Sequence, residues 1–449
     1  MEPQSSTPPL PPAKDDPKII FGWCMYDFAN SAYITIAVGL LPVYFATAII
    51  GPGGLTLRGV HYEADTLWAL MVGTADLIVF ACAPVLGAIA DFSAAKKRFL
   101  LFFAYLGSLA TTLLFLSHTG DVYRTMVFFL IAQICFTNAN VVYDAFLPQI
   151  ASQEKMDWVS GKGFSYGYVG GGVQFALALL LVVGHETLGI PQELAARIGI
   201  ASSGLWWAGF TLYTAKHLRE APSREVLPER YRDWPRPLAF VAVGVTRTVR
   251  TTLRVRRFRH LALFLLAFML YNDGIQTVIN LATAYGAVEL KLPVWVLMGT
   301  LLVIQVVATF GALVFSRLAE RIGAKPAIMV TLVLWTGVVG YAYFIRTATE
   351  FFILGVIVGV VLGGSQSLSR SFYGSMVPEA ASAQFFGFYT VFTKFSSVFG
   401  PLLFAVIKQT AGSSRLAILS LVVFFVAGLA LLAVVDETKA RQARLEEAF

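Results

Sequence analysis

The sequence predicts an all-α integral membrane protein whose twelve transmembrane helices form two six-helix pseudo-repeats around a central cavity. Of its 449 residues, 57% are hydrophobic and only 14% are charged, whereas a soluble domain has about 25% charged residues. The apolar runs are about 20 residues long, which is the length that an α-helix needs to cross a bilayer. Short landmarks also recur in the same order in both halves of the chain, which indicates an internal repeat.

Twelve stretches satisfy the length requirement, and their boundaries are expected to hold to within a few residues. In chain order they are 19–50, 66–90, 99–117, 122–146, 163–184, 197–216, 258–288, 294–317, 325–345, 350–373, 384–408 and 415–435. The connection between the sixth and seventh spans is the longest and divides the chain six plus six. Three cysteines, all within spans, predict neither a disulfide framework nor a zinc site.

This division predicts five segments. Residues 1–18 are Pro-rich and lack the features of a cleaved signal, so we expect a disordered cytosolic tail. Residues 19–216 form the first six-helix half and 258–435 the second. Between them, 217–257 is a basic cytosolic linker that ends in an amphipathic helix at the membrane surface. Residues 436–449 form a cytosolic C-terminal tail.

The basic residues predict the orientation. Twenty-five of the 34 lysines and arginines fall in segments on the same side as the N-terminus, and seven fall on the other side. Basic loops stay in the cytoplasm, so both termini are predicted to be cytoplasmic. Because the net charge of +7 is concentrated there, we expect contact with lipid headgroups and no nucleic-acid partner. Short loops favour a bacterial inner membrane, and we expect a monomer.

The repeat is visible at the ends of equivalent spans. Gly87–Asp91 is followed by Lys96, and Ser316–Glu320 is followed by Lys325 at the same spacing. Leu-Pro at the end of the fourth span is matched by Val-Pro at the end of the tenth. Tyr-Asp in the first span is matched by Tyr-Asn-Asp in the seventh. Parallel repeats with a site between them near mid-membrane are a transporter architecture.

The first span contains a polar patch. Asp27, Asn30 and Ser31 follow one another at i, i+3 and i+4 and therefore share one helix face. A charged side chain at hydrocarbon depth costs at least a few kcal/mol, about 2.5 or more at the helix centre. We therefore expect this face to line the bundle interior or a wet cavity, with a partner for Asp27.

Several motifs resemble those of a known superfamily. The loop G-A-I-A-D…K-K-R after the second span resembles the major facilitator superfamily. Y-D-F-A-N-S-A-Y, V-S-G-K-G-F-S-Y-G-Y-V-G-G-G, S-R-S-F-Y-G-S-M-V-P and F-F-G-F-Y-T-V-F-T-K-F-S-S-V-F-G-P-L resemble its branch of autophagy-related vacuolar amino-acid effluxers and bacterial relatives. The resemblance extends from about residue 19 to 435.

The resemblance implies that spans one, four, seven and ten line the central cavity. Polar residues of these spans, with mid-span charges of spans two and eleven, are the substrate and cavity candidates: Tyr26, Asp27, Asn30, Ser31, Asp76, Asn138, Asn140, Tyr271, Asn272, Asp273, Gln276, Gln366 and Lys394. The gating candidates lie nearer the inner face: Asp91, Lys96, Asp144, Glu320, Lys325 and Arg370. The alternative for each is a hydrogen bond or ion pair that only holds the bundle together.

The loop after the second span departs from the superfamily pattern, because Phe92 and Ala94 occupy the positions of a basic residue and a glycine. The resemblance implies a charge latch that favours the outward-facing state. Asp91 retains the ability to accept hydrogen bonds from a helix N-terminus, where a carboxylate is favoured.

The predicted function is secondary active transport of a small polar solute, amino-acid-like and outward, by alternating access. Carboxylates of spans one and seven with the Lys394 amine would suit a zwitterion, and Asp273 or Asp76 would couple transport to protons. No cofactor is expected, and the sequence contains no G-x-x-x-x-G-K-[ST] for ATP drive. The alternatives are an exporter of a lipid-like or drug-like amphipathic compound and a transport-inactive scaffold or receptor. An enzyme is disfavoured because no catalytic constellation appears at one membrane face.

Overall fold

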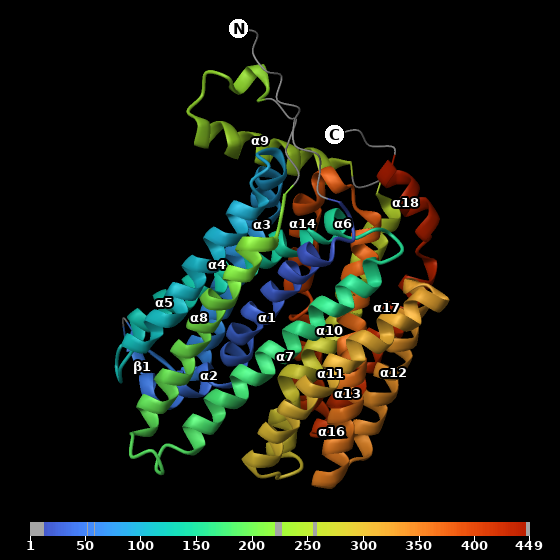
Figure 1. Ribbon diagram of the computed structural model, residues 1–449. Coiled ribbons are helices and arrows are strands. Elements are labelled where there is room, and N and C mark those ends of the chain that lie inside the picture. Colours follow the sequence, from blue (N-terminus) through green and yellow to red (C-terminus); the bar gives the residue numbers. More distant parts are fainter. Residues whose placement is uncertain (1–12, 52, 58, 221–226, 255–257, 446–449) are drawn as a thin grey trace.

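The computed structural model describes residues 13–51, 53–57, 59–220, 227–254 and 258–445. Every predicted span coincides with a helix or with a run of consecutive helical segments (Figure 1). Most limits agree within a few residues, but the helix Met156–Val183 begins seven residues before the predicted start of the fifth span, 163. The first half contains α1 (Pro17–Gly39), α2 (Leu41–Tyr44), the π-helical turn Phe45–Ile50, α3 (Ala64–Phe92), α4 (Lys96–Leu113) with the 3-10 turn Leu114–Leu116, α5 (Val122–Ala145), α6 (Leu147–Ile150), α7 (Met156–Val183) and α8 (Gln192–His217).

The second half repeats this arrangement. It contains α10 (Arg259–Val288), α11 (Val294–Ile322), α12 (Ala324–Phe344), α13 (Ala348–Met376), the 3-10 turn Glu379–Ala381, α14 (Ser382–Phe395), α15 (Phe399–Ala411), α16 (Ser414–Ser420) and α17 (Val422–Val434). The linker holds the 3-10 turn Glu229–Tyr231 and α9 (Arg236–Leu253), and α18 (Glu437–Leu445) follows the last span. A two-stranded antiparallel hairpin, β1 (Leu55–Leu57) and β2 (Val60–Tyr62), follows the first span.

Eleven of the spans in the described residues are long and apolar enough to cross a membrane, if the pair Pro17–Gly39 and Leu41–Ile50, bent by 42°, is counted as one. The twelfth is α8, whose 26 residues extend about 39 Å at 1.5 Å per residue. This helix is more polar because it carries Glu193, Arg197 and Lys216. Arg197 is buried and donates from Nε to the Phe115 carbonyl oxygen at 2.6 Å. The predicted twelve-helix, two-repeat fold is confirmed.

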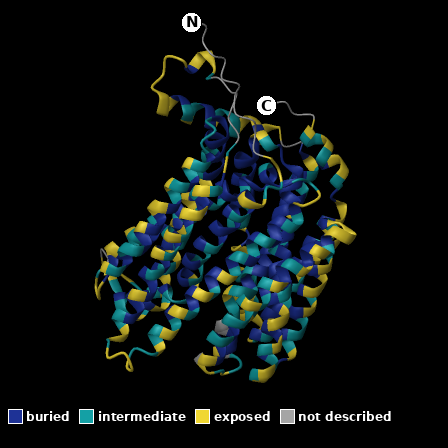
Figure 2. Ribbon diagram, in the orientation of Figure 1, coloured by how far each residue is buried: buried dark blue, intermediate teal, exposed yellow. Residues whose placement is uncertain are grey.

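The surface of the bundle suits a lipid environment. Large apolar side chains are exposed along the outer sides of the spans, for example Leu77 at 68% and Leu180 at 69%. Figure 2 shows the buried residues between the helices and the exposed ones on the outside of the bundle. An apolar surface of this extent marks a membrane-embedded protein.

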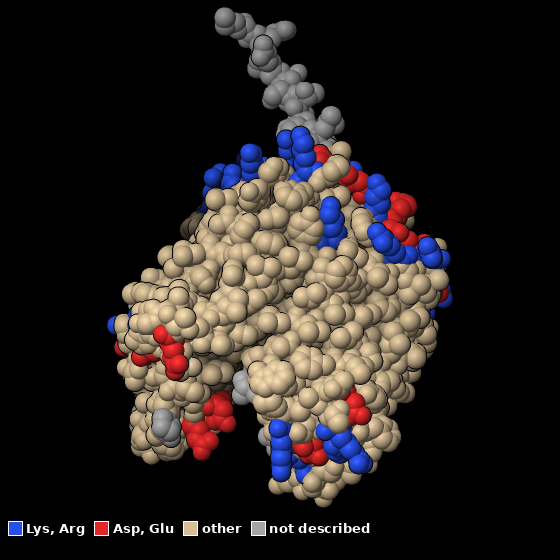
Figure 3. Space-filling view, turned by 60° about the horizontal axis from the view of Figure 1, so that its bottom comes forward, with Lys and Arg blue, Asp and Glu red and all other residues tan. Residues whose placement is uncertain are grey.

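The two halves meet along a limited set of helices. Between the halves, α7 packs against α11 and α13, and α14 packs against α3 and α5. The two ends of the described chain lie at one end of the bundle, together with the helices α9 and α18 (Figure 1). We call this end the termini face. At the opposite face the halves diverge, and Figure 3 shows a cleft between two lobes there.

Segments outside the spans also pack on the termini face. Helix α9 crosses the end of α3, where Gly244 lies so close that a Cβ atom would come within 2.6 Å of the Ile89 side chain. The C-terminal segment forms α18, from which Arg444 donates to the Ser375 carbonyl oxygen at 3.0 Å. The predicted N-terminal tail lies largely outside the described residues, as do parts of the predicted linker and C-terminal tail; α1 begins at Pro17.

Candidate functional site

The termini face is closed by a buried arginine that crosses from one half to the other. Arg370 of α13 is 3% exposed. Its guanidinium enters a site formed only by the first half, which we call the Arg370 cage: Trp23, Asp27, Tyr143, Asp144, Ser160 and Phe164, from α1, α5 and α7.

Polar atoms of the cage surround the edge of the guanidinium. Arg370 Nη1 donates to Asp144 Oδ1 at 3.0 Å and lies 3.5 Å from Asp27 Oδ2. Nε donates to Ser160 Oγ at 3.0 Å, and Nη2 donates to the Ser160 carbonyl oxygen at 2.8 Å. Charge-assisted hydrogen bonds to carboxylates are about twice as strong as neutral ones, so the second half is held firmly here.

Aromatic rings surround the rest of the cation. The Arg370 Cζ atom lies 4.1 Å from the ring centroid of Phe164, 4.8 Å from that of Trp23 and 5.4 Å from that of Tyr143. Aromatic faces attract a cation within about 6 Å, and more strongly when water is excluded. Trp23 and Tyr143 are themselves stacked, with centroids 4.5 Å apart, so the cage is preformed by contacts within the first half.

The glycines of V-S-G-K-G-F-S-Y-G make room for the cage. A Cβ atom on Gly163 would lie 2.9 Å from Arg370 Nη2 and 2.6 Å from the Trp23 ring. One turn later, a Cβ atom on Gly167 would lie 2.8 Å from Asp27 Oδ1. The motif therefore lets α7 approach both the cation and one of its carboxylates.

Asp27 is fixed by its neighbours as well as by Arg370. The Tyr143 hydroxyl donates to Asp27 Oδ2 at 3.1 Å, and the Ser31 hydroxyl donates to Oδ1 at 3.4 Å. The polar face predicted for the first span thus points into the interior and finds the expected partner.

A second cross-half contact closes the same face at α3 and α14. Both oxygens of Asp91 accept backbone N–H groups at the start of α14, from Ala383 at 3.2 Å and Gln384 at 2.8 Å. Lys96 Nζ lies 2.7 Å from Asp91 Oδ1. A carboxylate at a helix N-terminus is electrostatically favourable, and this is the geometry expected for Asp91 despite the altered loop motif.

The equivalent loop of the second half behaves differently, and this corrects the expectation drawn from the repeat. Lys325 Nζ donates to the backbone carbonyl oxygens of Ala433 and Val435, at 2.8 and 2.7 Å. Glu320 is exposed. The lysine therefore caps the end of α17 and does not form a latch with Glu320, because the last span ends beside it.

Lys394 forms an ion pair with a carboxylate of the first half. Its amine lies 2.7 Å from Asp76 Oδ1, across the boundary between α14 and α3. The two side chains are 23% and 26% exposed. Two cavity candidates, Lys394 and Asp76, are thus brought together, whereas Asp27 and Asp273, which we expected to share a mixed-sign cavity with Lys394, have other partners.

Asp273 supports a break in the eleventh span. Its carboxylate accepts backbone N–H groups from Phe399 at 3.1 Å and Gly400 at 2.9 Å, at the start of α15. The Asn272 amide donates to the Ser396 hydroxyl within the break. Asp273 is 1% exposed, so its carboxylate caps a half-helix and does not face the cleft.

The remaining candidates form hydrogen bonds around these clusters. Asn30 donates to Asn140 at 2.5 Å, and the Tyr168 hydroxyl donates to Gln366 at 2.6 Å. Tyr271 and Ser369 share a hydrogen bond of 2.6 Å. Tyr26 and Asn138 are buried within the first half, whereas Gln276 is half-buried.

Sequence reasoning missed the aromatic cage residues Trp23, Tyr143 and Phe164, and it also missed two residues at the start of α7. Ser160 contributes two acceptors to Arg370, and Asp157 accepts from the Ser371 hydroxyl at 2.5 Å. Both lie in or next to V-S-G-K-G-F, a motif that the sequence analysis used for the family resemblance alone. The sequence offered no signal for these contacts, because they join segments about 210 residues apart.

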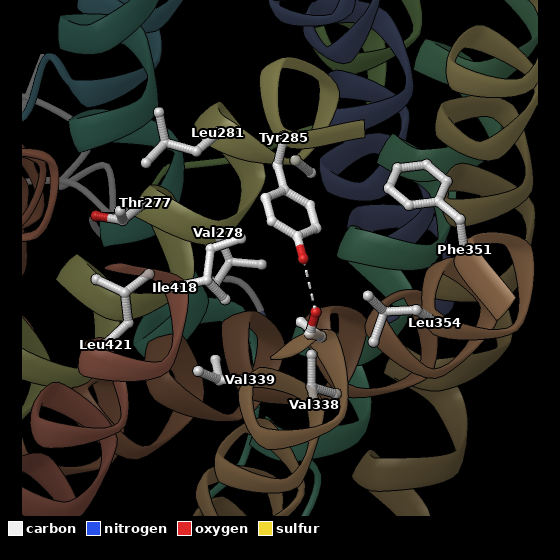
Figure 4. A pocket seen from close by; sticks show the side chains of 12 residues that line it. Thr277, Val278, Leu281, Tyr285, Val338, Val339, Phe351, Leu354, Ile418 and Leu421 are labelled. Carbon is white, nitrogen blue, oxygen red and sulfur yellow. Dashed lines mark hydrogen bonds between the residues drawn. The ribbon is translucent and has the colours of Figure 1, made fainter. Parts of the chain in front are cut away.

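A separate pocket lies within the second half, between α10, α12, α13 and α16 (Figure 4). Its lining is almost entirely apolar, and the Tyr285 hydroxyl beside it donates to the Ala342 carbonyl oxygen at 3.0 Å. It has no charged group to recognise a polar solute. Among the described residues, no group of three or more His, Cys, Asp or Glu side chains is placed to hold a metal ion.

Comparison with known proteins shows which family the chain resembles. Residues 15–445 match the family described as vacuole effluxer Atg22 like. The chain is 35% identical over 418 residues to an uncharacterized MFS-type transporter of Bacillus subtilis, YxiO, covering 92% of this chain and 94% of that protein. It is 27% identical to autophagy-related protein 22 of Kluyveromyces lactis, over 74% and 71% of the two chains.

Solved structures show the same fold. The proton:xylose symporter XylE, a major facilitator superfamily protein, superposes with a TM-score of 0.69 over 94% of this chain and 97% of that one, at 13% sequence identity. At this level of identity the likeness concerns the fold alone.

Proposed function

Because the chain belongs to the Atg22-like vacuole effluxer family of major facilitator transporters, we propose that it exports a small, polar, amino-acid-like solute by alternating access. The family consists of membrane transporters, so this protein is a multi-pass membrane transporter and not an enzyme. The proposal concerns the substrate, the direction and the mechanism.

The observation that carries the proposal is the unequal closure of the two faces. On the termini face, the Arg370 cage and Asp91 join the halves through buried charged contacts. On the opposite face the halves are separated by a cleft (Figure 3). Alternating access requires these contacts to break when the cleft closes, and their placement supports a state that is open away from the termini.

The Lys394–Asp76 pair supports a zwitterionic substrate. Its two charges come from opposite halves, and each is about one quarter exposed. A solute with a carboxylate and an ammonium group could exchange its own charges with this pair, so each end of the solute would find a counter-charge. Opposite charges attract more strongly in a low-dielectric cavity than in water.

The direction rests on charge. With the basic termini face in the cytoplasm, the observed state opens outward, and export requires loading from the termini face in the other state. The family description names vacuole effluxers, which supports movement away from the cytoplasm. The match over nearly the whole length of a Bacillus subtilis protein supports the location of this protein in a bacterial inner membrane.

The test is solute flux in proteoliposomes. Purified protein would be reconstituted with a mixture of labelled amino acids, and we expect efflux of at least one of them. Lys394→Ala and Asp76→Ala should each reduce this flux at least tenfold, whereas Asp76→Asn keeps an acceptor oxygen for the solute ammonium. Lys408→Ala is the matched control, because Lys408 is exposed in the last turn of α15, a helix that packs against α10 and α16 of its own half.

Two results would contradict the proposal. If no amino acid or related zwitterion moves while amphipathic dyes or lipid analogues do, the alternative substrate class is correct. If no solute of either kind moves through well-folded protein, the scaffold or receptor alternative is correct.

A further inference from the structure

We propose that the Arg370 cage is a binding site for a cationic group of the solute, a primary ammonium or a guanidinium, and that Arg370 displaces this group when the termini face closes. The inference rests on the proposed export function and adds an earlier site for the solute: its cationic group binds the cage while the termini face is open, and passes to the Lys394–Asp76 pair when Arg370 returns. In this view, Arg370 of the second half competes with the solute cation for a site formed by residues of the first half.

The first step is the division of the cage between the halves. Every contact of the guanidinium described above comes from α1, α5 or α7, and Arg370 itself comes from α13. Opening the termini face separates α13 from these helices. The arginine must then leave, while the cage stays intact because Trp23 Nε1 donates to the Tyr143 carbonyl oxygen at 2.8 Å and Tyr143 holds Asp27.

The second step is charge. Among the described residues, Arg370 is the cation that pairs with Asp27 and Asp144, and no other lysine or arginine there lies within ion-pair distance of either carboxylate. Withdrawal of the arginine leaves two carboxylates without a counter-charge inside the membrane. Unpaired buried charges are strongly unfavourable, so the open cage favours another cation.

The third step is the chemistry of the cage. Two carboxylates, a serine hydroxyl and a serine carbonyl oxygen all accept hydrogen bonds, and the three aromatic rings present their faces to the cation. This combination recognises an ammonium or guanidinium, which offers several N–H donors and a positive charge to aromatic faces. An anion or a neutral sugar would leave these acceptors unmatched.

The site explains how closure would drive release. Arg370 and the solute cation cannot occupy the cage together, because the Gly163 Cα already lies against the guanidinium and leaves no room for a methyl group. Return of Arg370 therefore expels the cation as the cleft on the opposite face opens. The competition between Arg370 and the solute cation for the cage therefore accounts both for loading from the termini face and for release toward the cleft.

The test uses ethylguanidinium as the probe and ethylurea, its neutral isostere, as the comparison. Equilibrium dialysis of the purified full-length protein should show saturable binding of ethylguanidinium to Arg370→Ala, at least tenfold tighter than to the unmodified protein. Ethylurea should bind to neither. Adding Asp144→Asn to Arg370→Ala should weaken ethylguanidinium binding at least tenfold.

Arg124→Ala is the matched control, since it also removes an arginine bonded to an aspartate and a backbone carbonyl, but at an exposed site near the opposite face. It should bind the probe like the unmodified protein. Arg370→Gln serves as a second variant that fills the volume without the charge, in case Arg370→Ala is not monodisperse.

The inference is overturned if well-folded Arg370→Ala and Arg370→Gln bind ethylguanidinium no better than the unmodified protein, or if Asp144→Asn has no effect on that binding. The proposed function fails separately. Absence of amino-acid flux together with Asp144-dependent probe binding would refute export and retain the cage, whereas flux without probe binding would retain export and refute the cage.

Discussion

The Arg370 cage and the Lys394–Asp76 pair use the same chemistry in different surroundings. In each, a basic residue of the second half meets carboxylates of the first half, at 3.0 Å in the cage and 2.7 Å in the pair. The Arg370 side chain is 4% exposed and that of Lys394 is 23% exposed. Because the distances are nearly the same, burial is what distinguishes the two contacts: while the termini face is closed, a solute can reach the partly exposed Lys394–Asp76 pair but not the Arg370 cage.

The physical basis is the cost of breaking each contact. Removing one partner of a buried ion pair costs about 3–5 kcal/mol because the other charge is left unpaired. An ion pair that water reaches contributes about 1 kcal/mol or less. The predictions below test this difference, in order of decreasing effect on conformational free energy.

The largest effect is expected for Arg370→Ala, which should shift the equilibrium away from closure of the termini face by about 3–5 kcal/mol. Spin labels would be placed at Arg98 and Arg321, two exposed positions near the termini face in opposite halves. Electron–electron distance measurements should show a longer distance between the labels in Arg370→Ala than in the unmodified protein. Arg370→Lys retains the charge and should recover part of the closed population. An unchanged distance distribution would place the closing force elsewhere.

Asp91→Ala should have the next largest effect. It leaves Lys96 without its partner and exposes the first N–H groups of α14, and loss of a helix cap costs about 0.5–2 kcal/mol. The same pair of labels should report a smaller population of the open termini face than Arg370→Ala produces. A shift larger than that of Arg370→Ala would reverse the ranking of the two closures.

Asp273→Ala tests a buried carboxylate that has no ion-pair partner among the residues that the structure describes. The structure assigns its oxygens to the start of α15, so we expect a loss of thermal stability of about 1–2 kcal/mol, with solute exchange retained. Asp273→Asn keeps one acceptor and should lose less. Abolished exchange in a stable Asp273→Asn protein would instead return this residue to the transport pathway.

Asp76→Asn should barely change thermal stability, by about 1 kcal/mol or less, and yet change transport. Because Asp76 is partly exposed, we propose it over the capped Asp273 as the proton-coupling carboxylate. Accumulation driven by a pH gradient should be lost, while exchange of labelled for unlabelled solute at equal pH is retained. The same pH dependence in Asp76→Asn and unmodified protein would exclude this role.

The smallest effect is expected for Glu220, a carboxylate on the termini face outside the spans. It accepts backbone N–H groups from Lys96 at 2.7 Å and Lys97 at 3.0 Å, and burial raises its pKa above the ordinary glutamate value. The folded protein therefore binds this proton more tightly than the unfolded chain, so the contribution of Glu220 to stability falls as pH rises through the window between the two pKa values. Glu220→Gln should flatten this part of the pH–stability curve in thermal unfolding measurements, and an unaltered slope would contradict the assignment.

The sequence alone determined the elements and the residues available for chemistry. Span positions, the six-plus-six division and the polar face of Asp27, Asn30 and Ser31 depend on local hydrophobicity and helical periodicity, which each segment carries by itself. The contact of Asp91 with a helix N-terminus was also foreseen from the chemistry of a carboxylate. The break at 396–398 was not, because an apolar run shows its length but not where its hydrogen bonding is interrupted.

Only the tertiary structure decided which charges meet. Lys394 pairs with Asp76 and not with Asp273. Lys325 caps the end of α17 and does not pair with Glu320. Arg370 enters a cage of aromatic rings from three other helices. Each choice depends on how far a helix is rotated and translated against its neighbours. Those quantities come from side-chain packing between segments far apart in the chain, and a single helix carries no information about them.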